Sequence, residues 1–197
     1  MEEMKKIIEE SFQESIRAKQ LCLEQNSEPL IQAATMIVDA FHNENKLMIF
    51  GNGGSAADAQ HIAAEFVNRF MIERPPLPAI ALTTDTSILT SIGNDYDFND
   101  IFSKQIKALG MEGDVAWGLS TSGTSANVVE ALKVARDRGL RTLGMTGGGG
   151  GRFAEVVQVL LTADASNTAR IQECHITMCH IICELVDYHL FQRLSIQ

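Results

Sequence analysis

The chain has 197 residues, of which 45% are apolar and 21% are charged, as in ordinary globular proteins with a buried core. Its formal net charge of −9 argues against nonspecific nucleic-acid binding, which needs Lys and Arg to neutralise phosphates. No stretch is apolar for long enough to span a membrane, and neither the acidic start nor the four cysteines indicate secretion, so we expect a cytoplasmic protein without membrane or nucleic-acid partners.

Two helical stretches are predicted in residues 1–45. The triplet Ser27-Glu28-Pro29 predicts the start of the second helix, with Ser27 as its N-cap. Together the two stretches would form an N-terminal extension that packs on the domain or on another subunit. The first stretch has apolar residues at intervals of four with charged residues between them, as an amphipathic helix does: Met4, Ile8, Phe12 and Ile16.

After residue 46 the pattern changes to short apolar runs that do not alternate with polar residues. Such runs suit strands that are buried on both faces, as in a parallel sheet. Helical patterns at 55–70 and 125–138 separate several of them, and a long helix is predicted over 168–194. We therefore expect one α/β domain over 1–197, whose residues 46–197 form a doubly wound, five-stranded parallel sheet flanked by helices. The five runs are 47–50, 78–82, 115–119, 142–145 and 156–161.

A loop rich in Ser and Thr, residues 120–125, follows the third predicted strand and precedes a helical pattern. Ligands of open α/β sheets bind at the carboxyl ends of strands, where the free N–H groups of a helix start favour an anion. Gly123 would let this backbone fold tightly. The loop predicts a site for a phosphate monoester, and the alternative is a Ser/Thr-rich turn with a helix cap. Its hydroxyls belong to Ser120, Thr121, Ser122 and Ser125.

Residues 51–55 form a second loop of this kind after the first predicted strand. Ala56 stands where a dinucleotide-binding GxGxxG motif would have its last glycine, and no acidic residue ends the next strand near Leu82. Two Ser/Gly loops at neighbouring strand ends indicate one small phosphorylated ligand instead. A further loop, the glycine run 147–151, is interpreted as a mobile surface turn.

Two pairs of side chains on predicted helices could bind a metal or exchange protons. His61 and Glu65 are four residues apart, and Gln172 and His180 are eight apart, so each pair shares a helix face. Imidazole, carboxylate and amide oxygen atoms can bind zinc or another divalent metal, or act without metal as acid and base. The alternatives are a helix-surface contact for the first pair and a hydrogen-bonded core position for His180.

Four separated stretches extend these patterns over nearly the whole chain: GNGGSAADAQHIAAEF at 51–66, IGNDYDFNDIF at 92–102, STSGTSANVV at 120–129 and ARIQECHITMCH at 169–180. In this order they resemble the phosphoheptose isomerases, a branch of the sugar isomerase (SIS) domain proteins. The resemblance implies a SIS fold and an aldose–ketose isomerase. Its reaction would convert sedoheptulose 7-phosphate to D-glycero-D-manno-heptose 7-phosphate through a cis-enediol(ate), the first step toward activated heptose for bacterial surface polysaccharide such as lipopolysaccharide.

The resemblance also implies roles for single residues. Glu65 would be the base that takes a proton alpha to the carbonyl, and His180 the acid or proton shuttle between oxygens. One zinc ion per subunit would polarise the carbonyl, with His61, Glu65, Gln172 and His180 as its ligands. Ser55 would join the Ser/Thr loop in holding the phosphate. Further contacts to the substrate would come from Asn52, Gly53, Gly54, His61, Glu65, Asn94, Asp95 and Gln172.

Alternatives to this enzyme exist within the same family. One SIS relative binds the bacterial replication initiator protein without catalysis and lacks a carboxylate at position 65 and an imidazole at position 180, both of which this chain has. An isomerase for another sugar phosphate would keep the chemistry, although such relatives often carry additional regulatory domains. Some isomerases, but not all, have Asp at the position of Ala169, so the resemblance implies the reaction here without implying that secondary contact. The family is typically a homotetramer with active sites at subunit boundaries.

Overall fold

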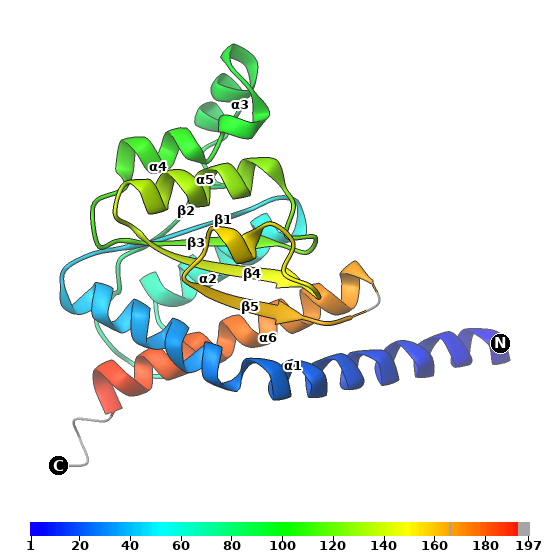
Figure 1. The fold of residues 1–197 in the computed structure, drawn as a ribbon. Helices are drawn as coiled ribbons and strands as arrows, with labels where there is room; N and C mark the ends of the chain where they lie inside the picture. The colour runs from blue at the N-terminus through cyan, green and yellow to red at the C-terminus, as the bar shows by residue number, and fades with distance from the viewer. Residues whose placement is uncertain (166, 193–197) are drawn as a thin grey trace.

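In the computed structural model, which describes residues 1–165 and 167–192, a five-stranded parallel sheet lies between two layers of helices (Figure 1). The order across the sheet is β2-β1-β3-β4-β5, and every neighbouring pair is parallel. The chain thus proceeds to opposite sides of β1, and the loops that follow β1 and β3 diverge at this switch point. The predicted doubly wound fold is confirmed. Its strands are β1 (Leu47–Gly51), β2 (Ala79–Ala81), β3 (Val115–Ser120), β4 (Arg141–Gly147) and β5 (Val159–Ala163).

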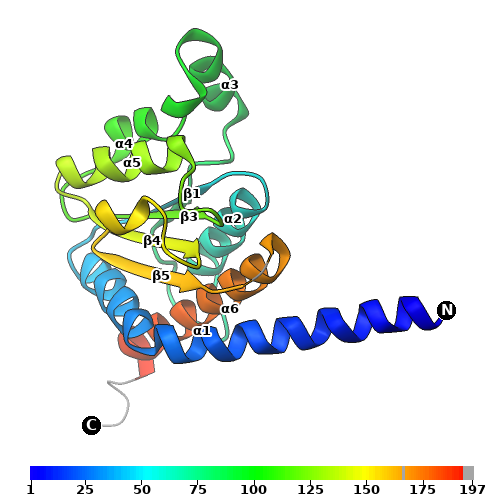
Figure 2. The same cartoon turned by 45° about the vertical axis from the view of Figure 1, so that its right-hand side comes forward.

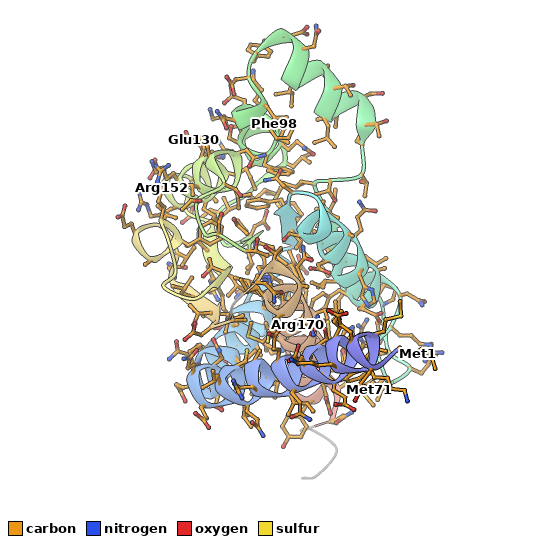
Figure 3. All side chains as sticks on the ribbon, turned by 90° about the vertical axis from the view of Figure 1, so that its right-hand side faces the viewer. Met1, Met71, Phe98, Glu130, Arg152 and Arg170 are labelled. Atoms are coloured by element: carbon orange, nitrogen blue, oxygen red, sulfur yellow. The ribbon has the colours of Figure 1, made fainter. Side chains whose placement is uncertain are left out.

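Both faces of the sheet are buried, because alternate strand residues point to opposite sides. Leu47 and Ile49 of β1 join the apolar cluster beneath α1, α2 and α6. Met48 and Phe50 join the cluster beneath α4 and α5. Seen from the side, Phe98 lies in the upper helix layer (Figure 3). The helices are α1 (Glu2–His42), α2 (Gly54–Val67), α3 (Thr86–Asp95), α4 (Ser103–Leu109), α5 (Ala126–Asp137) and α6 (Thr168–Asp187).

The two N-terminal helices predicted from sequence are one helix of 41 residues, and the N-cap predicted at Ser27 is wrong. Ser27 Oγ donates to the carbonyl of Leu23 from inside the helix, and Pro29 removes only one backbone hydrogen bond. Tertiary contacts compensate for this loss. The buried Asn26 side chain donates to the carbonyl of Thr162 and accepts from its N–H, at 2.8 and 2.9 Å, which fastens α1 along edge strand β5.

The first turns of α1 extend beyond the body of the domain (Figures 1 and 2). Packing against α6 and β5 involves its later turns, in which Cys22, Leu30 and Ala33 are buried. The projecting turns carry apolar side chains that remain largely exposed, at the intervals of four seen in the sequence. These are Met4, Ile8, Phe12 and Ile16, exposed by 70%, 56%, 68% and 49%.

Other boundaries differ from the sequence-based prediction. The fifth strand begins at Val159, not at residue 156, because Phe153 and Val156 are buried against the α5 layer and residues 153–155 form a 3-10 helix. The last helix ends at Asp187 and continues as a π-helical turn, Tyr188–Gln192; residues 193 and 194 of the predicted helix lie outside the described part. Helices α3 and α4 were not predicted. No helix within the described ranges combines the length and apolarity needed to cross a bilayer.

Asp114, at the start of β3, fastens the end of the sheet opposite to the ligand loops. Its buried carboxylate accepts hydrogen bonds from the backbone N–H groups of Lys46 and Met111 at 2.9 and 2.8 Å. It also pairs with the ammonium group of Lys46 and accepts from the Asn45 amide. Burial alone would raise the pKa of Asp114, but these donors outweigh it and hold the pKa below its ordinary value.

Replacing this carboxylate should therefore destabilise the fold in a pH-dependent way. Asp114→Asn should lower the free energy of unfolding at pH 7 by about 1–3 kcal/mol. Because the pKa of Asp114 is lower in the native state than in the unfolded state, its carboxylate stabilises the fold fully above the unfolded pKa near 4. This stabilisation is lost as the pH falls through the native pKa, so the difference from wild type should shrink in acid. Urea unfolding at pH 7 and pH 3 measures both effects. The exposed Asp137→Asn should change stability by less than about 0.5 kcal/mol, and a pH-independent effect of Asp114→Asn would contradict the assignment.

Candidate functional site

The loops after β1 and β3 meet at the carboxyl end of the sheet, as predicted. Gly51 lies beside Leu119 in the register of the two strands. A Cβ at Gly51 would lie 2.8 Å from the carbonyl oxygen of Leu119, so only glycine permits this approach. Beyond the strands, the side-chain amides of Asn52 and Asn127 exchange two hydrogen bonds of 2.8 Å. These contacts tie the start of α2 to the start of α5.

The hydroxyls of the Ser/Thr loop converge. Ser120 Oγ lies 2.8 Å from Ser125 Oγ and 3.3 Å from Ser122 Oγ. Gly123 has φ +64°, a backbone conformation that a residue with a Cβ rarely adopts. Its turn lets the loop fold back toward the N-terminal end of α5. Ser120 is buried while Ser122 is exposed, so the group of hydroxyls opens to solvent on one side.

The glycine run 147–151 is more than the mobile surface turn interpreted from its sequence. Gly148, Gly149 and Gly151 are exposed, but Gly147, Gly150 and Gly151 also lie against the backbone of the Ser/Thr loop. The N–H of Gly147 donates to the carbonyl of Thr121 at 3.0 Å. A Cβ on Gly151 would lie 2.7 Å from the carbonyl oxygen of Gly123 and 2.8 Å from that of Ser122. The run therefore shapes the loop by close backbone packing.

The packing of α6 on α2 places His180 against the pair formed by His61 and Glu65. His61 Nε2 lies 3.2 Å from Glu65 Oε1 on the same helix and 3.2 Å from His180 Nε2 on α6. The Phe70 ring stacks on His180, with centroids 5.4 Å apart. The His61 side chain is 47% exposed and that of Glu65 is 25% exposed, so the group is accessible to a ligand. An imidazole and a carboxylate in this contact can exchange protons.

Gln172 enters the same region from the first turns of α6. Its side-chain amide lies against Gly54, where a Cβ would collide with it. Gln172, His61 and Asp58 line a hollow of about 440 Å³ between α2 and α6. Burial raises the pKa of the Asp58 carboxyl, an effect that the neighbouring His61 opposes. Asp58 was not predicted from sequence, although its i,i+3 spacing to His61 placed it on the same helix face.

Asn94 and Asp95 do not lie with His61, Glu65 and His180. Both are exposed on α3, and the Asn94 amide donates to the Asp95 carboxylate at 2.8 Å. Helix α3 projects from the layer on the other side of the sheet from α6 (Figure 1). The base of this segment does adjoin the first loop, because Leu89 and Phe98 share a hollow of about 150 Å³ with Asn52 and Gly53.

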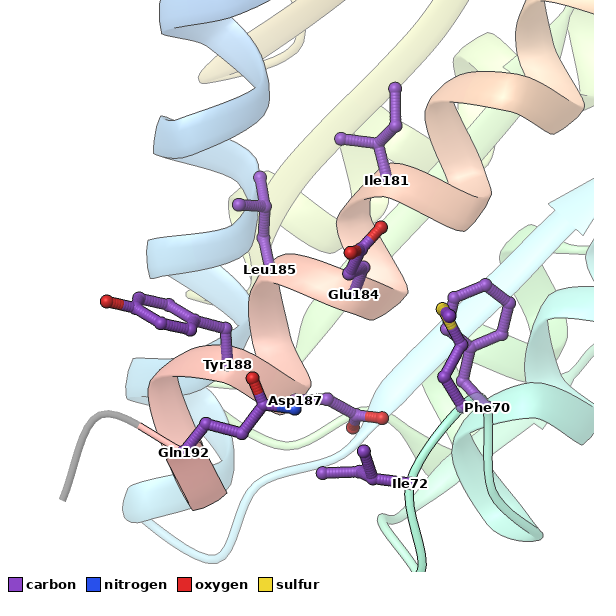
Figure 4. A pocket seen from close by; sticks show the side chains of 9 residues that line it. Phe70, Ile72, Ile181, Glu184, Leu185, Asp187, Tyr188 and Gln192 are labelled. Atoms are coloured by element: carbon purple, nitrogen blue, oxygen red, sulfur yellow. The ribbon is translucent and has the colours of Figure 1, made fainter. Parts of the chain in front are cut away.

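A larger hollow of about 610 Å³ lies elsewhere, and none of the predicted site residues lines it. It lies between the segment 70–72 and the end of α6, where apolar side chains such as Phe70 and Leu185 line it together with the polar Glu184, Asp187 and Gln192 (Figure 4). The residues of α6 that line it start at Ile181, just after His180, and no residue of either ligand loop lines it. In the part of the chain that the structure describes, no group of three or more His, Cys, Asp or Glu side chains is placed to hold a metal ion.

Comparison with known proteins identifies the family. Residues 11–147 match the model of the SIS domain. The chain belongs to the SIS domain family. Within this family it is 52% identical to the phosphoheptose isomerase of Nitratidesulfovibrio vulgaris (strain Hildenborough), over 98% of this chain and 92% of that protein. It is 51% identical to the phosphoheptose isomerase of Aquifex aeolicus, over 98% and 99%.

Solved structures agree with this assignment to the SIS domain family. The phosphoheptose isomerase from Neisseria gonorrhoeae superposes with a TM-score of 0.88 and 48% identity, over 93% of this chain and 98% of that one. That from Francisella tularensis gives a TM-score of 0.90 at 38% identity, over 95% and 99%. The resemblance inferred from the four sequence stretches is confirmed.

Proposed function

We propose that this protein is a phosphoheptose isomerase, which converts sedoheptulose 7-phosphate to D-glycero-D-manno-heptose 7-phosphate. The observation that carries the proposal is the contact of His61 with both Glu65 and His180. Two members of this acid–base group lie on α2, the helix that begins at the first ligand loop of the SIS domain. The sequence identity of 52% and 51% to two phosphoheptose isomerases supports the proposed substrate, sedoheptulose 7-phosphate. No contact of the described residues favours the noncatalytic alternative, a module that binds a partner protein.

In the proposed reaction Glu65 removes a proton from C1 of the open-chain ketose, next to the C2 carbonyl. The electron pair forms a cis-enediol(ate), and the same carboxyl group returns the proton to C2. His180 gives a proton to O2 and takes one from O1, because an imidazole ring can both donate and accept a proton. Both groups come from rigid helices, so their positions relative to the sugar are fixed before the reaction begins.

We infer that the phosphate is held by the Ser/Thr loop. The converging hydroxyls of Ser120, Ser122 and Ser125 and the N–H groups at the start of α5 suit a phosphate monoester. Anchoring the phosphate fixes the far end of the sugar and directs binding energy to the reacting carbons. The contacts proposed for Asn94 and Asp95 stay a prediction from the resemblance. The remaining proposed contacts are Thr121, Ser55, Asn52, Gly53, Gly54, His61, Glu65 and Gln172.

Zinc is the cofactor that we propose, one ion per subunit, with His61, Glu65, His180 and Gln172 as its ligands. Ligand atoms at about 2.0–2.1 Å from a tetrahedral zinc lie roughly 3.3 Å apart. The distances of 3.2 Å from His61 Nε2 to Glu65 Oε1 and to His180 Nε2 match this spacing for two pairs of donors. As the described side chains lie, the three do not together form a metal site, so zinc binding requires them to turn toward a common point. A bound zinc ion would polarise the sugar carbonyl and stabilise the enediolate oxygen.

Turnover of sedoheptulose 7-phosphate by the purified protein, with and without added zinc, tests the proposed function. Glu65→Gln should lower kcat by about 100- to 10,000-fold, because the amide cannot accept the proton. The matched control is Glu130→Gln, an exposed carboxylate on α5 in the other helix layer (Figure 3), which should keep the wild-type rate. A wild-type rate in Glu65→Gln would refute the base assignment. Binding of the sugar phosphate without turnover at any zinc concentration would favour the noncatalytic module.

A pair of glycine variants tests the phosphate loop. Gly151→Ala and Gly149→Ala both place a Cβ on a residue with positive φ, at a cost of about 1–2 kcal/mol. Only Gly151→Ala pushes the new Cβ against the carbonyls of Ser122 and Gly123, since Gly149 has open space around it. Calorimetric affinity for inorganic phosphate should fall about tenfold or more in Gly151→Ala, as for loss of one hydrogen bond to a charged group. Equal affinities in the two variants would place the phosphate elsewhere.

A homotetramer is our proposal for the assembly. The apolar side chains on the projecting turns of α1 need a partner, and a second copy of this helix would cover them. Phe12→Lys should therefore give a smaller species in size-exclusion chromatography with light scattering. Glu10→Gln makes the same change in charge on the opposite face of the helix and should leave the assembly intact. An unchanged mass for Phe12→Lys would contradict this use of α1.

We also propose a cytoplasmic location and a place in the supply of activated heptose for bacterial surface polysaccharide such as lipopolysaccharide. The location is supported by the cysteines, which are all buried and free: Cys22, Cys174, Cys179 and Cys183. The pathway is supported by the reaction proposed above, whose product is a heptose phosphate ready for activation.

A further inference from the structure

Arg74 is a buried arginine in the connection between α2 and β2, and only 7% of its surface is exposed. Arginine is almost never buried to this extent unless its charge is paired. Here Nε donates to Asp187 Oδ1 at 2.7 Å, in an ion pair whose side chains are 1% and 4% exposed. Nη2 donates to the carbonyl of Glu65 at 2.9 Å, and Nη1 to the carbonyl of Phe66 at 2.8 Å. One guanidinium group thus connects two helices.

The positions of these partners relate Arg74 to the proposed active site. The carbonyls of Glu65 and Phe66 belong to the last turn of α2, where carbonyls lack partners within the helix and a positive charge is favourable. Asp187 lies seven residues, or about two turns, after His180 on α6, so both project from the same face. Arg74 therefore joins the backbone of Glu65 to the face of α6 that carries His180.

The same connection makes a second contact to the site. Phe70 stacks on the His180 ring with an interplanar angle of 26°. Figure 4 shows Asp187 reaching from α6 toward the segment that includes Phe70 and Ile72. We propose that Arg74 is a positioning residue for the isomerase, which fixes the backbone of Glu65 relative to His180 through its ion pair with Asp187. This inference rests on the proposed function and adds a residue that touches neither the sugar nor the reacting atoms.

The geometry of the guanidinium explains why arginine stands at this position. Its planar fork donates to four acceptors, the Asp187 carboxylate and the carbonyls of Glu65, Phe66 and Pro75, whereas the ammonium group of a lysine is a single point charge. Burial raises the pKa of Asp187, and Arg74 opposes this rise by stabilising the carboxylate. Arg74→Lys keeps the charge for Asp187 but loses the simultaneous hold on the two carbonyls of α2. A displacement of about 1 Å at catalytic groups can lower a rate about 100-fold.

Steady-state kinetics on the intact protein test the proposal. Arg74→Lys and Asp187→Asn should lower kcat by about tenfold or more, while KM for sedoheptulose 7-phosphate changes less than about twofold, because the proposed phosphate contacts come from other elements. Asp114→Asn is the matched control, since it also removes a buried carboxylate from an ion pair, at the opposite end of the sheet. It should lose stability but keep kcat. A kcat in Arg74→Lys as high as in Asp114→Asn would overturn the proposal.

A second measurement decides the geometry independently of turnover. The ring signals of His61 and His180, assigned with His61→Gln and His180→Gln, should shift in Arg74→Lys in a two-dimensional NMR spectrum at one pH. They should not shift in Asp114→Asn. Unmoved signals in Arg74→Lys would overturn the positioning role. Absence of turnover in wild type would instead refute the proposed function, and the ring signals would still test the link from Arg74 to His61 and His180.

Discussion

The packing of α6 against α2 is the contact on which the proposed chemistry depends. Glu65 and His61 come from α2 and His180 from α6, so neither helix alone contains the acid–base group. The connection after α2 reinforces this packing, because Arg74 hydrogen-bonds to Asp187 on α6 and to the carbonyl of Glu65 on α2. Buried ion pairs add little net stability on average, since desolvation offsets their attraction. Their directional hydrogen bonds nevertheless fix distances, which is what a pair of proton-transfer groups needs.

Close backbone approach is the second constraint, and it governs the ligand loops. The parallel sheet places the ends of β1 and β3 side by side, and Gly51 lets the chain turn there against Leu119. Behind the Ser/Thr loop, Gly147 and Gly151 contact its carbonyls without a side chain between them. The hydroxyls of Ser120, Ser122 and Ser125 then converge, and the group opens to solvent at Ser122. Glycine supplies the shape of this region, and serine and threonine supply its polar surface.

Helix α1 has one part that packs on the core and one part that is exposed to solvent. Its later turns bury apolar residues against α6 and support the helix that carries His180. Asn26 satisfies the free N–H and carbonyl of Thr162 on edge strand β5, which protects that edge from pairing with another chain. The projecting turns have the opposite character, with apolar residues exposed to solvent. Helix α1 therefore supports the proposed site through its later turns and carries, on its first turns, the apolar surface that we propose is covered by α1 of a second subunit.

The sequence alone determined the elements whose signals are local. Apolar runs predicted five strands, and i,i+4 spacing placed His61 and Glu65 on one face of a helix. Only the tertiary structure decided that α1 continues through Pro29, that the glycine run supports the Ser/Thr loop, and that Asn94 lies away from His180. Arg74 had no sequence signal at all. Its role depends on carbonyls and a carboxylate that are distant along the chain, and periodicity reports only on near neighbours, whereas packing brings remote segments together.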